Sequence, residues 1–136
     1  MAYGISPALP LVYTAPDGPY GLTKTIPEAL IQNFKNLVLT NPGERMMDPE
    51  FGVGITQFLF EQQNSFVYSK IRTRLGEQVA RYLPSIKLVE VLFNDASGFS
   101  LASQTDNNIL YVKIVFRIEP LNITAALLLP VSTGLV

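Results

Sequence analysis

The chain has 136 residues, enough for one domain with a sizeable core and too few for two domains of ordinary size. Ten basic and eleven acidic side chains leave a formal net charge of -1, which predicts no nucleic-acid partner. The sequence holds no histidine and no cysteine, so the commonest general base, the thiol nucleophile and the usual zinc ligands are excluded, and we expect no metal and no cofactor.

The apolar content of the chain is high. Hydrophobic residues make up 48% of the sequence and charged residues only 15%, which predicts apolar surface that partner proteins cover. The late apolar stretch, residues 123–131, is shorter than the roughly 20 residues that cross a bilayer. Residues 1–7 lack the positive start and apolar run of a secretory signal. We therefore expect neither a membrane span nor export by that route.

Residues 1–24 are expected to form an extended N-terminal arm. Their prolines, together with the turn at Asp17 and Gly18, favour extended or turn conformations without continuous sheet pairing. The arm is too apolar for a solvated tail, so we expect it to lie against this domain or a neighbouring protein. The residues behind this expectation are Leu9, Leu11, Val12, Tyr13 and Tyr20.

A first helix is predicted from Thr25 to about Leu39. Thr25 and Glu28 have the spacing of a capping box, and Pro27 is tolerated in the first turn of a helix. The apolar residues then recur at helical spacing and predict a face that packs on a core. They are Leu30, Phe34, Leu37 and Val38.

A second helix is predicted to begin after Asn64 or Ser65 and to end at Leu83, because Pro84 disfavours a helical conformation in the residue before it. Its apolar face contains Val67, Ile71, Leu75, Val79 and Tyr82. Its other face has an excess of positive charge, which fits either a solvated surface or an acidic partner. This charged face contains Lys70, Arg72, Arg74, Glu77 and Arg81.

Strands are predicted over residues 86–94, 109–119 and 123–129, with the polar segment 95–108 as an antiparallel connection. The second run alternates apolar and largely polar side chains, as a strand with one buried face does. We therefore predict an α+β fold in which two main helices pack on one face of a small antiparallel sheet. Residues 25–136 would form this single domain behind the arm.

Residues 41–54, with the sequence NPGERMMDPEFGVG, join the first helix to a short apolar turn at residues 55–60. Prolines restrict φ in this segment, and glycines permit positive φ or a close backbone approach. The pattern predicts a connector of defined conformation. Its structural residues are Pro42, Gly43, Pro49, Phe51, Gly52 and Gly54.

This segment, with residues 37–40 before it and 58–61 after it, resembles the signature of the lysozyme-like baseplate wedge family of contractile-tailed bacteriophages. Type VI secretion baseplates contain relatives of that family, and such a counterpart is the alternative. The similarity extends from residue 18 through both helices into the strands. The order of Pro, Gly, Glu, Arg and Phe makes the signature specific.

The resemblance implies a structural baseplate wedge protein without enzymatic activity. Its location would be the virion tail baseplate, assembled in the host cytoplasm, with multiple copies in a symmetric assembly. Such a protein sits on a helical core bundle of other wedge proteins and presents its sheet to the tail sheath protein. Sheath arms would add strands to that sheet through main-chain hydrogen bonds. Nucleic acid and membrane are not among the implied partners.

Many family members carry an acidic-Pro-Arg motif at the end of the second helix, where this chain has Leu83, Pro84 and Ser85. Both charges of that motif are missing here, so the usual ion-pair contact with the bundle does not carry over. Contact would then depend on shape, apolar surface or nearby charges. The candidate partner-binding residues are Glu44, Arg45, Arg81, Pro84, Ser85, Lys87, Tyr111, Lys113 and Arg117.

Glu44 and Arg45 also fit an internal role, in which they stabilise the connector by hydrogen bonds or an ion pair. The polar strand residues Tyr111, Lys113 and Arg117 also fit solvated cross-strand pairs.

The family name raises one enzymatic alternative, a peptidoglycan hydrolase. A glycosidase needs two carboxyl groups about 5–10 Å apart across a sugar-binding cleft, one of them held protonated. Sequence proximity does not establish such a pair, and the chain has no tryptophan to stack on a sugar. We therefore assign no catalytic residues. The carboxylates available for this alternative are Glu44, Asp48, Glu50 and Glu61.

Overall fold

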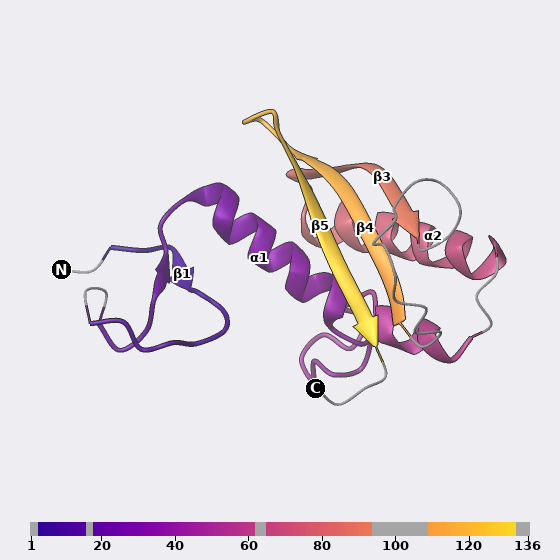
Figure 1. Cartoon of the computed structure of the whole chain (residues 1–136), viewed down its shortest axis with the longest axis horizontal. Helices are drawn as coiled ribbons and strands as arrows, with labels where there is room; N and C mark the ends of the chain where they lie inside the picture. The colour runs from indigo at the N-terminus through magenta and orange to yellow at the C-terminus, as the bar shows by residue number, and fades with distance from the viewer. Residues whose placement is uncertain (1–2, 16–17, 62–64, 94–108, 133–136) are drawn as a thin grey trace. The chain divides into compact units, whose positions relative to one another are not determined.

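The computed structural model describes residues 3–15, 18–61, 65–93 and 109–132 (Figure 1). The elements follow the order β1, β2, α1, η1, α2, β3, β4, β5, where η1 is a short 3-10 helix. Two compact units make up the chain, residues 1–36 and residues 37–136, so that α1 begins in the first unit and ends in the second. The domain boundary expected after residue 24 stays a prediction.

In the first unit, β1 (Ser6–Pro7) pairs antiparallel with β2 (Leu22–Thr23). The buried hydroxyl of Thr23 donates a hydrogen bond of 3.0 Å to the carbonyl oxygen of Ser6. Gln32 of α1 holds the same segment, because its amide donates to the carbonyl of Pro7 at 2.9 Å and accepts from the amide of Leu9 at 3.1 Å. Residues 6–9 are therefore held by hydrogen bonds to β2 and α1.

Helix α1 (Ile26–Leu39) begins at the predicted capping box. The amide of Glu28 donates to the hydroxyl oxygen of Thr25 at 3.4 Å, and the carboxylate of Glu28 accepts from the amide of Thr25 at 3.3 Å. These reciprocal bonds satisfy two donors that the first turn leaves unpaired. The hydrogen bond with Thr25 also lowers the pKa of the Glu28 carboxyl group.

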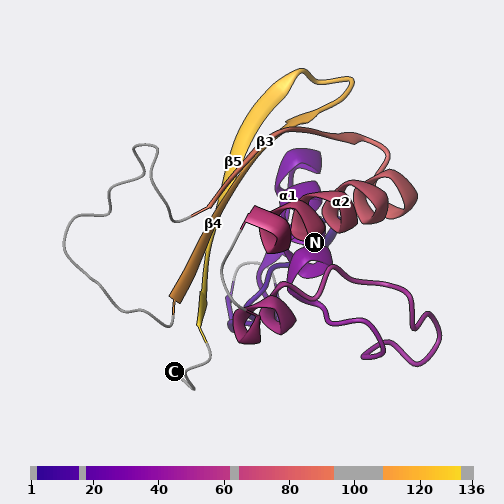
Figure 2. The same ribbon diagram turned by 90° about the vertical axis from the view of Figure 1, so that its right-hand side faces the viewer.

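The second unit contains a three-stranded antiparallel sheet with the order β3 (Ile86–Phe93), β4 (Ile109–Ile118), β5 (Ile123–Ser132). Helix α2 (Ser65–Tyr82) lies on one face of this sheet (Figure 2), which we call the inner face. The α+β class and the two main helices are confirmed. The position of α1 on the sheet stays a prediction.

Burial follows the periodicity of each element. On α2 the buried side chains are those of Val67, Ile71, Leu75 and Val79, as predicted from their helical spacing. On β4 every second residue from Val112 to Ile118 is fully buried on the inner face. The opposite side of the sheet, which we call the outer face, carries the intervening, largely polar residues of β4. The inner-face residues of β4 are Val112, Ile114, Phe116 and Ile118.

Strand β5 is longer than predicted. It continues through Pro130 to Ser132, whereas the sequence prediction ends at Leu129. Proline is compatible with a strand at the edge of a sheet, where its nitrogen faces away from the neighbouring strand. The predicted connection 95–108 and Asn94, the predicted end of the first strand, lie outside the described residues. Among the residues that the structure describes, no helix is long and apolar enough to cross a membrane.

The inner face of β4 should dominate the stability of the second unit. Phe116 is fully buried, so Phe116→Ala removes a large apolar side chain and leaves a cavity, and we expect a loss of about 3–5 kcal/mol in the free energy of unfolding. Urea denaturation measures this loss. Val115→Ala, on the half-exposed outer face, is the matched control and should cost much less. Equal losses for both variants would contradict the assignment of the core.

Candidate functional site

Residues 41–54, which we call the connector, return to the end of α1 before η1 (Ile55–Phe60) begins. The amide of Val53 donates to the carbonyl of Leu37 at 3.0 Å, and the amide of Gly54 donates to that of Thr40 at 2.9 Å. Gly52 has φ of +111°, and a Cβ atom there would lie 2.2 Å from the carbonyl oxygen of Thr40. Only glycine fits this close approach, as the sequence predicted.

The first half of the connector is closed by Glu44. Its carboxylate accepts hydrogen bonds from the backbone amide of Asn41 at 3.0 Å and from the side-chain amide of Asn41 at 2.9 Å. The amide of Gly43 donates to the carbonyl of Pro49 at 2.9 Å and joins the two sides of the loop. Glu44 therefore makes the internal hydrogen bonds that the sequence allowed for. A contact between Glu44 and a partner stays a prediction.

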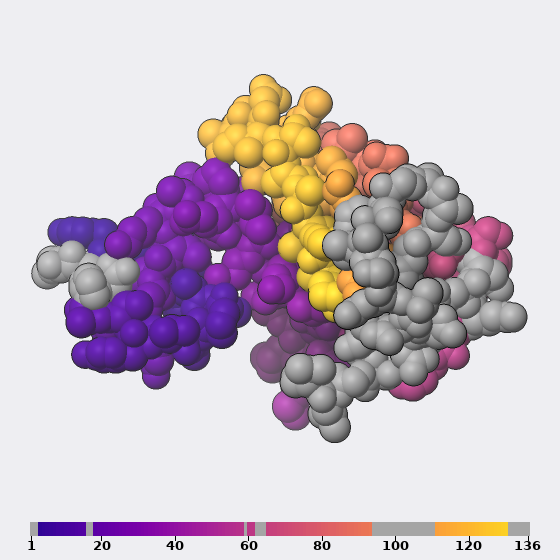
Figure 3. Space-filling model, viewed as in Figure 1, coloured from indigo at the N-terminus to yellow at the C-terminus, as the bar shows by residue number. Residues whose placement is uncertain are grey.

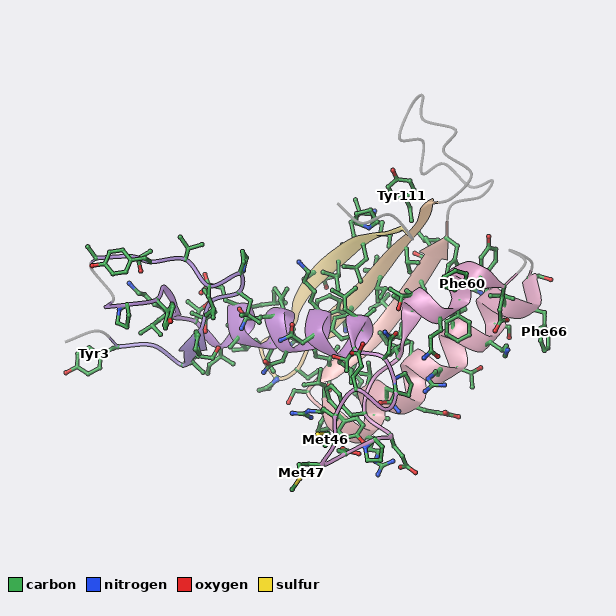
Figure 4. The ribbon with its side chains drawn as sticks, turned by 90° about the horizontal axis from the view of Figure 1, so that it is seen from below. Tyr3, Met46, Met47, Phe60, Phe66 and Tyr111 are labelled. Carbon is green, nitrogen blue, oxygen red and sulfur yellow. The ribbon has the colours of Figure 1, made fainter. Side chains whose placement is uncertain are left out.

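The tip of the connector displays two methionines. Met46 and Met47 are 96% and 98% exposed and are directed away from the rest of the second unit (Figure 4). Next to them, the guanidinium of Arg45 lies 4.2 Å from the centre of the Phe51 ring, a cation–π contact. The ring of Phe51 in turn meets Tyr82 of α2 edge to face at 4.9 Å. The loop is thus held in place while its tip stays open.

Gln78 of α2 fixes the second half of the connector. Its side-chain oxygen accepts from the amide of Gly52 at 3.0 Å, and its side-chain nitrogen donates to the carbonyl of Glu50 at 3.1 Å. Arg81, one turn later, forms an ion pair with the carboxylate of Glu50. Both partners of this pair are largely exposed, so it contributes less to stability than the amide contacts do. Sequence reasoning missed Gln78, because its partners lie far away along the chain.

An open groove of about 690 Å³ runs between the connector and α2. Pro42, Pro49 and Glu50 form one wall, and residues 69–81 of α2 contribute the other. At its far end, Lys70 binds Glu61 at 3.2 Å. The groove therefore mixes apolar and charged side chains. It brings the predicted residue Arg81 close to the connector.

The predicted residues Pro84 and Ser85 follow Arg81 at the C-terminal end of α2, in the turn that leads into β3, and Lys87 is the second residue of β3. The amide of Ile86 donates to the carbonyl of Leu83 at 3.0 Å, which closes the turn. Ser85 accepts from the amide of Glu119 at 2.8 Å, so this turn lies beside the one that joins β4 to β5. Pro84 and Ser85 remain exposed.

The outer face of the sheet carries the remaining predicted residues, Tyr111, Lys113 and Arg117 of β4. Lys87 of β3 stands directly opposite Arg117, and its ammonium group lies 3.9 Å from the carboxylate of Glu119. Lys87 and Arg117 therefore lie next to the turn that contains Pro84, and we group them with it. The predicted partner-binding residues thus fall into a connector group, a turn group and the outer-face pair Tyr111 and Lys113.

Strand β5 forms one edge of the three-stranded sheet. All ten residues of β5 pair with β4 in an unbroken register, and none of them is charged. No described strand pairs with its other side. Figure 3 shows β5 at the surface over most of its length. An uncharged edge of this kind is suited to pairing with another chain.

The register indicates which backbone groups of β5 face that edge. Pro130 has no N–H, so its nitrogen should face away from β4. Backbone groups alternate in direction along an antiparallel ladder, so those of Thr124, Ala126 and Leu128 should also face the free edge. Leu127 then bonds to Ile114 of β4.

The carboxylates considered for hydrolysis do not form an isolated pair. Glu44 binds Asn41, Glu50 binds Arg81, and Glu61 binds Lys70. Within the described part of the chain, no cluster of three acidic residues suits a metal ion. These contacts are hydrogen bonds and ion pairs between exposed side chains, which stabilise the surface of the second unit.

An open sheet edge and a loop with exposed apolar side chains are both typical of a subunit of a larger assembly. Residues 25–121 match the model of the family described as baseplate wedge protein gp25, and the chain therefore belongs to that family. The resemblance inferred from the connector is confirmed. The match ends before β5 begins.

Two solved structures share the fold. One is a Geobacter sulfurreducens protein provisionally described as a tail lysozyme, with 22% sequence identity and a TM-score of 0.66 over 85% of this chain and 97% of that one. The other is a chain of the anti-feeding prophage baseplate, with 23% identity and a TM-score of 0.57 over 94% of this chain and 84% of that one. Comparison with curated proteins gives no significant match.

Loss of Gln78 should loosen the connector without unfolding the domain. Gln78→Ala removes two hydrogen bonds, and we expect a destabilisation of about 1–3 kcal/mol. Hydrogen exchange at the amide of Gly52 should become faster in this variant. Glu77→Ala, which changes an exposed neighbour on α2, is the control. Unchanged exchange at Gly52 in Gln78→Ala would show that other contacts hold the connector.

Proposed function

We propose that the chain is a structural, non-enzymatic wedge subunit of a contractile-tail baseplate, present in several copies. It docks on a helical bundle of other wedge proteins and starts the first ring of the tail sheath by strand addition. The observation that carries this proposal is the open, uncharged edge of β5. Membership of the baseplate wedge family supports the location at the tail baseplate.

Strand addition fits the chemistry of the β5 edge. An extended segment of a sheath subunit would receive and donate main-chain hydrogen bonds along β5. The exposed side chain of Leu128 and the half-buried side chain of Leu127 would gain apolar contacts from that segment on both faces of the sheet. The fold of the anti-feeding prophage baseplate chain is consistent with this role.

Docking on the bundle is assigned to the end of α2. Pro84 and Ser85 are exposed there, and Arg81 and Lys87 stand on either side of them. Arg81 and Lys87 supply positive charge next to the turn, where each also pairs with an acidic side chain, Glu50 and Glu119 respectively. The groove beside Arg81 extends the same surface toward the connector. An acidic helix of the bundle would complement it.

Proline at the β5 edge tests strand addition. Ala126→Pro removes an N–H that should face the free edge while the bonds between β4 and β5 remain. We expect a folded protein that joins baseplates but supports no sheath, measured by electron microscopy of assembled tails. Ala126→Val keeps the N–H and is the matched control. Full-length sheaths on Ala126→Pro baseplates would contradict recruitment through β5.

A peptidoglycan assay tests the absence of enzymatic activity. The purified chain should release no soluble muropeptides, because three of its four candidate carboxylates, those of Glu44, Glu50 and Glu61, are engaged in surface contacts. A lysozyme of known peptidoglycan-hydrolysing activity is the positive control for the assay. Turnover that disappears in both Glu44→Gln and Glu50→Gln would establish a hydrolase and overturn this part of the proposal.

A further inference from the structure

The two edges of the sheet differ, although both belong to strands of similar length. Strand β3 contains a bulge between Leu88 and Glu90, which leaves Val89 outside the pairing with β4 and 59% exposed. A bulge bends an edge strand and interrupts its row of hydrogen-bonding groups. The pairing of β5 has no such interruption.

The side chain of Arg72, on α2, covers the part of β3 that follows the bulge. Its guanidinium donates a hydrogen bond of 3.0 Å to the carbonyl oxygen of Val91 and lies 5.4 Å from the centre of the Phe93 ring. Tyr68, one turn earlier on α2, stacks on the same ring at 4.4 Å. Two side chains of α2 therefore cover the end of β3.

The register places the carbonyl of Val91 at the free edge. Val91 and Leu127 stand on opposite sides of the same central residue, Ile114. If Ile114 directs its backbone groups toward Leu127, as the position of Pro130 requires, then Val91 directs its own groups away from β4. The hydrogen bond from Arg72 to Val91 agrees with this direction. Arg72 thus takes the place that an N–H of an added strand would need.

We propose that Arg72 and the Val89 bulge close the β3 edge, so that the sheet accepts an added strand only at β5. This inference rests on the proposed strand addition and names its site. The accepted segment pairs with residues 123–129 and stops at Pro130, which has no N–H to offer. Both faces of β5 are apolar, so the partner is an extended, uncharged segment with apolar side chains on both faces.

Hydrogen exchange read by mass spectrometry locates the added strand. Baseplates that contain the full chain are compared with and without the sheath subunit of the same contractile system. We expect sheath to slow exchange in the peptide that covers residues 123–132 and to leave the peptide that covers residues 86–93 unchanged. The amides responsible should be those of Thr124, Ala126 and Leu128.

Arg72→Ala tests the closing residue itself. In this variant, sheath should slow exchange over residues 86–93 as well, because the carbonyl of Val91 becomes available. Arg72→Leu, which keeps apolar bulk over Phe93 but lacks the donor, should show the same gain. Lys35→Ala removes one positive charge from α1 and is the charge-matched control, which should keep the parent pattern. Circular dichroism confirms that each variant is folded.

The outcomes separate this inference from the proposed function. Protection of residues 86–93 in the parent protein would overturn the assignment to β5 and leave strand addition intact. Protection at neither edge would overturn strand addition and the proposed sheath role with it. Protection confined to residues 123–132 in both folded Arg72 variants would show that Arg72 does not close the β3 edge.

Discussion

A side chain at Gly52 would collide with the carbonyl oxygen of Thr40, and the geometry of the second unit depends on this close approach. Because the connector passes so near the end of α1, Val53 and Gly54 can bind its last carbonyl groups. The same path brings the amide of Gly52 to Gln78 of α2. The path of the connector therefore links the end of α1 to the C-terminal part of α2.

Two kinds of feature were predictable from the sequence. The capping box of Thr25 and Glu28, the apolar face of α2 and the alternation along β4 depend on residues that are close in the chain, and all three predictions are confirmed. The connector was predictable because its prolines restrict φ and its glycines permit the positive φ and close approach that the path requires. Local chemistry thus specified the elements and the family.

The long-range contacts were not predictable in the same way. Gln78 and Arg72 lie on a helix with many polar residues, and nothing near them in sequence distinguishes their partners. The grouping of positive side chains could not be predicted either, because it depends on the register of the strands. The register sets Lys87 opposite Arg117. The bulge at Val89 also had no local signal, since β-branched residues suit regular strands equally well. The geometry of the candidate site therefore became visible only once the fold was known.

The open edge of β5 has a consequence for the protein before it is incorporated. A free subunit presents the same uncharged row of backbone groups to every other copy, so pairing between copies competes with the intended partner and rises with concentration. The rate at which the chain is synthesised relative to its partners then helps to determine how much of it reaches the assembly. The amount of this subunit relative to its partners therefore affects how efficiently it assembles.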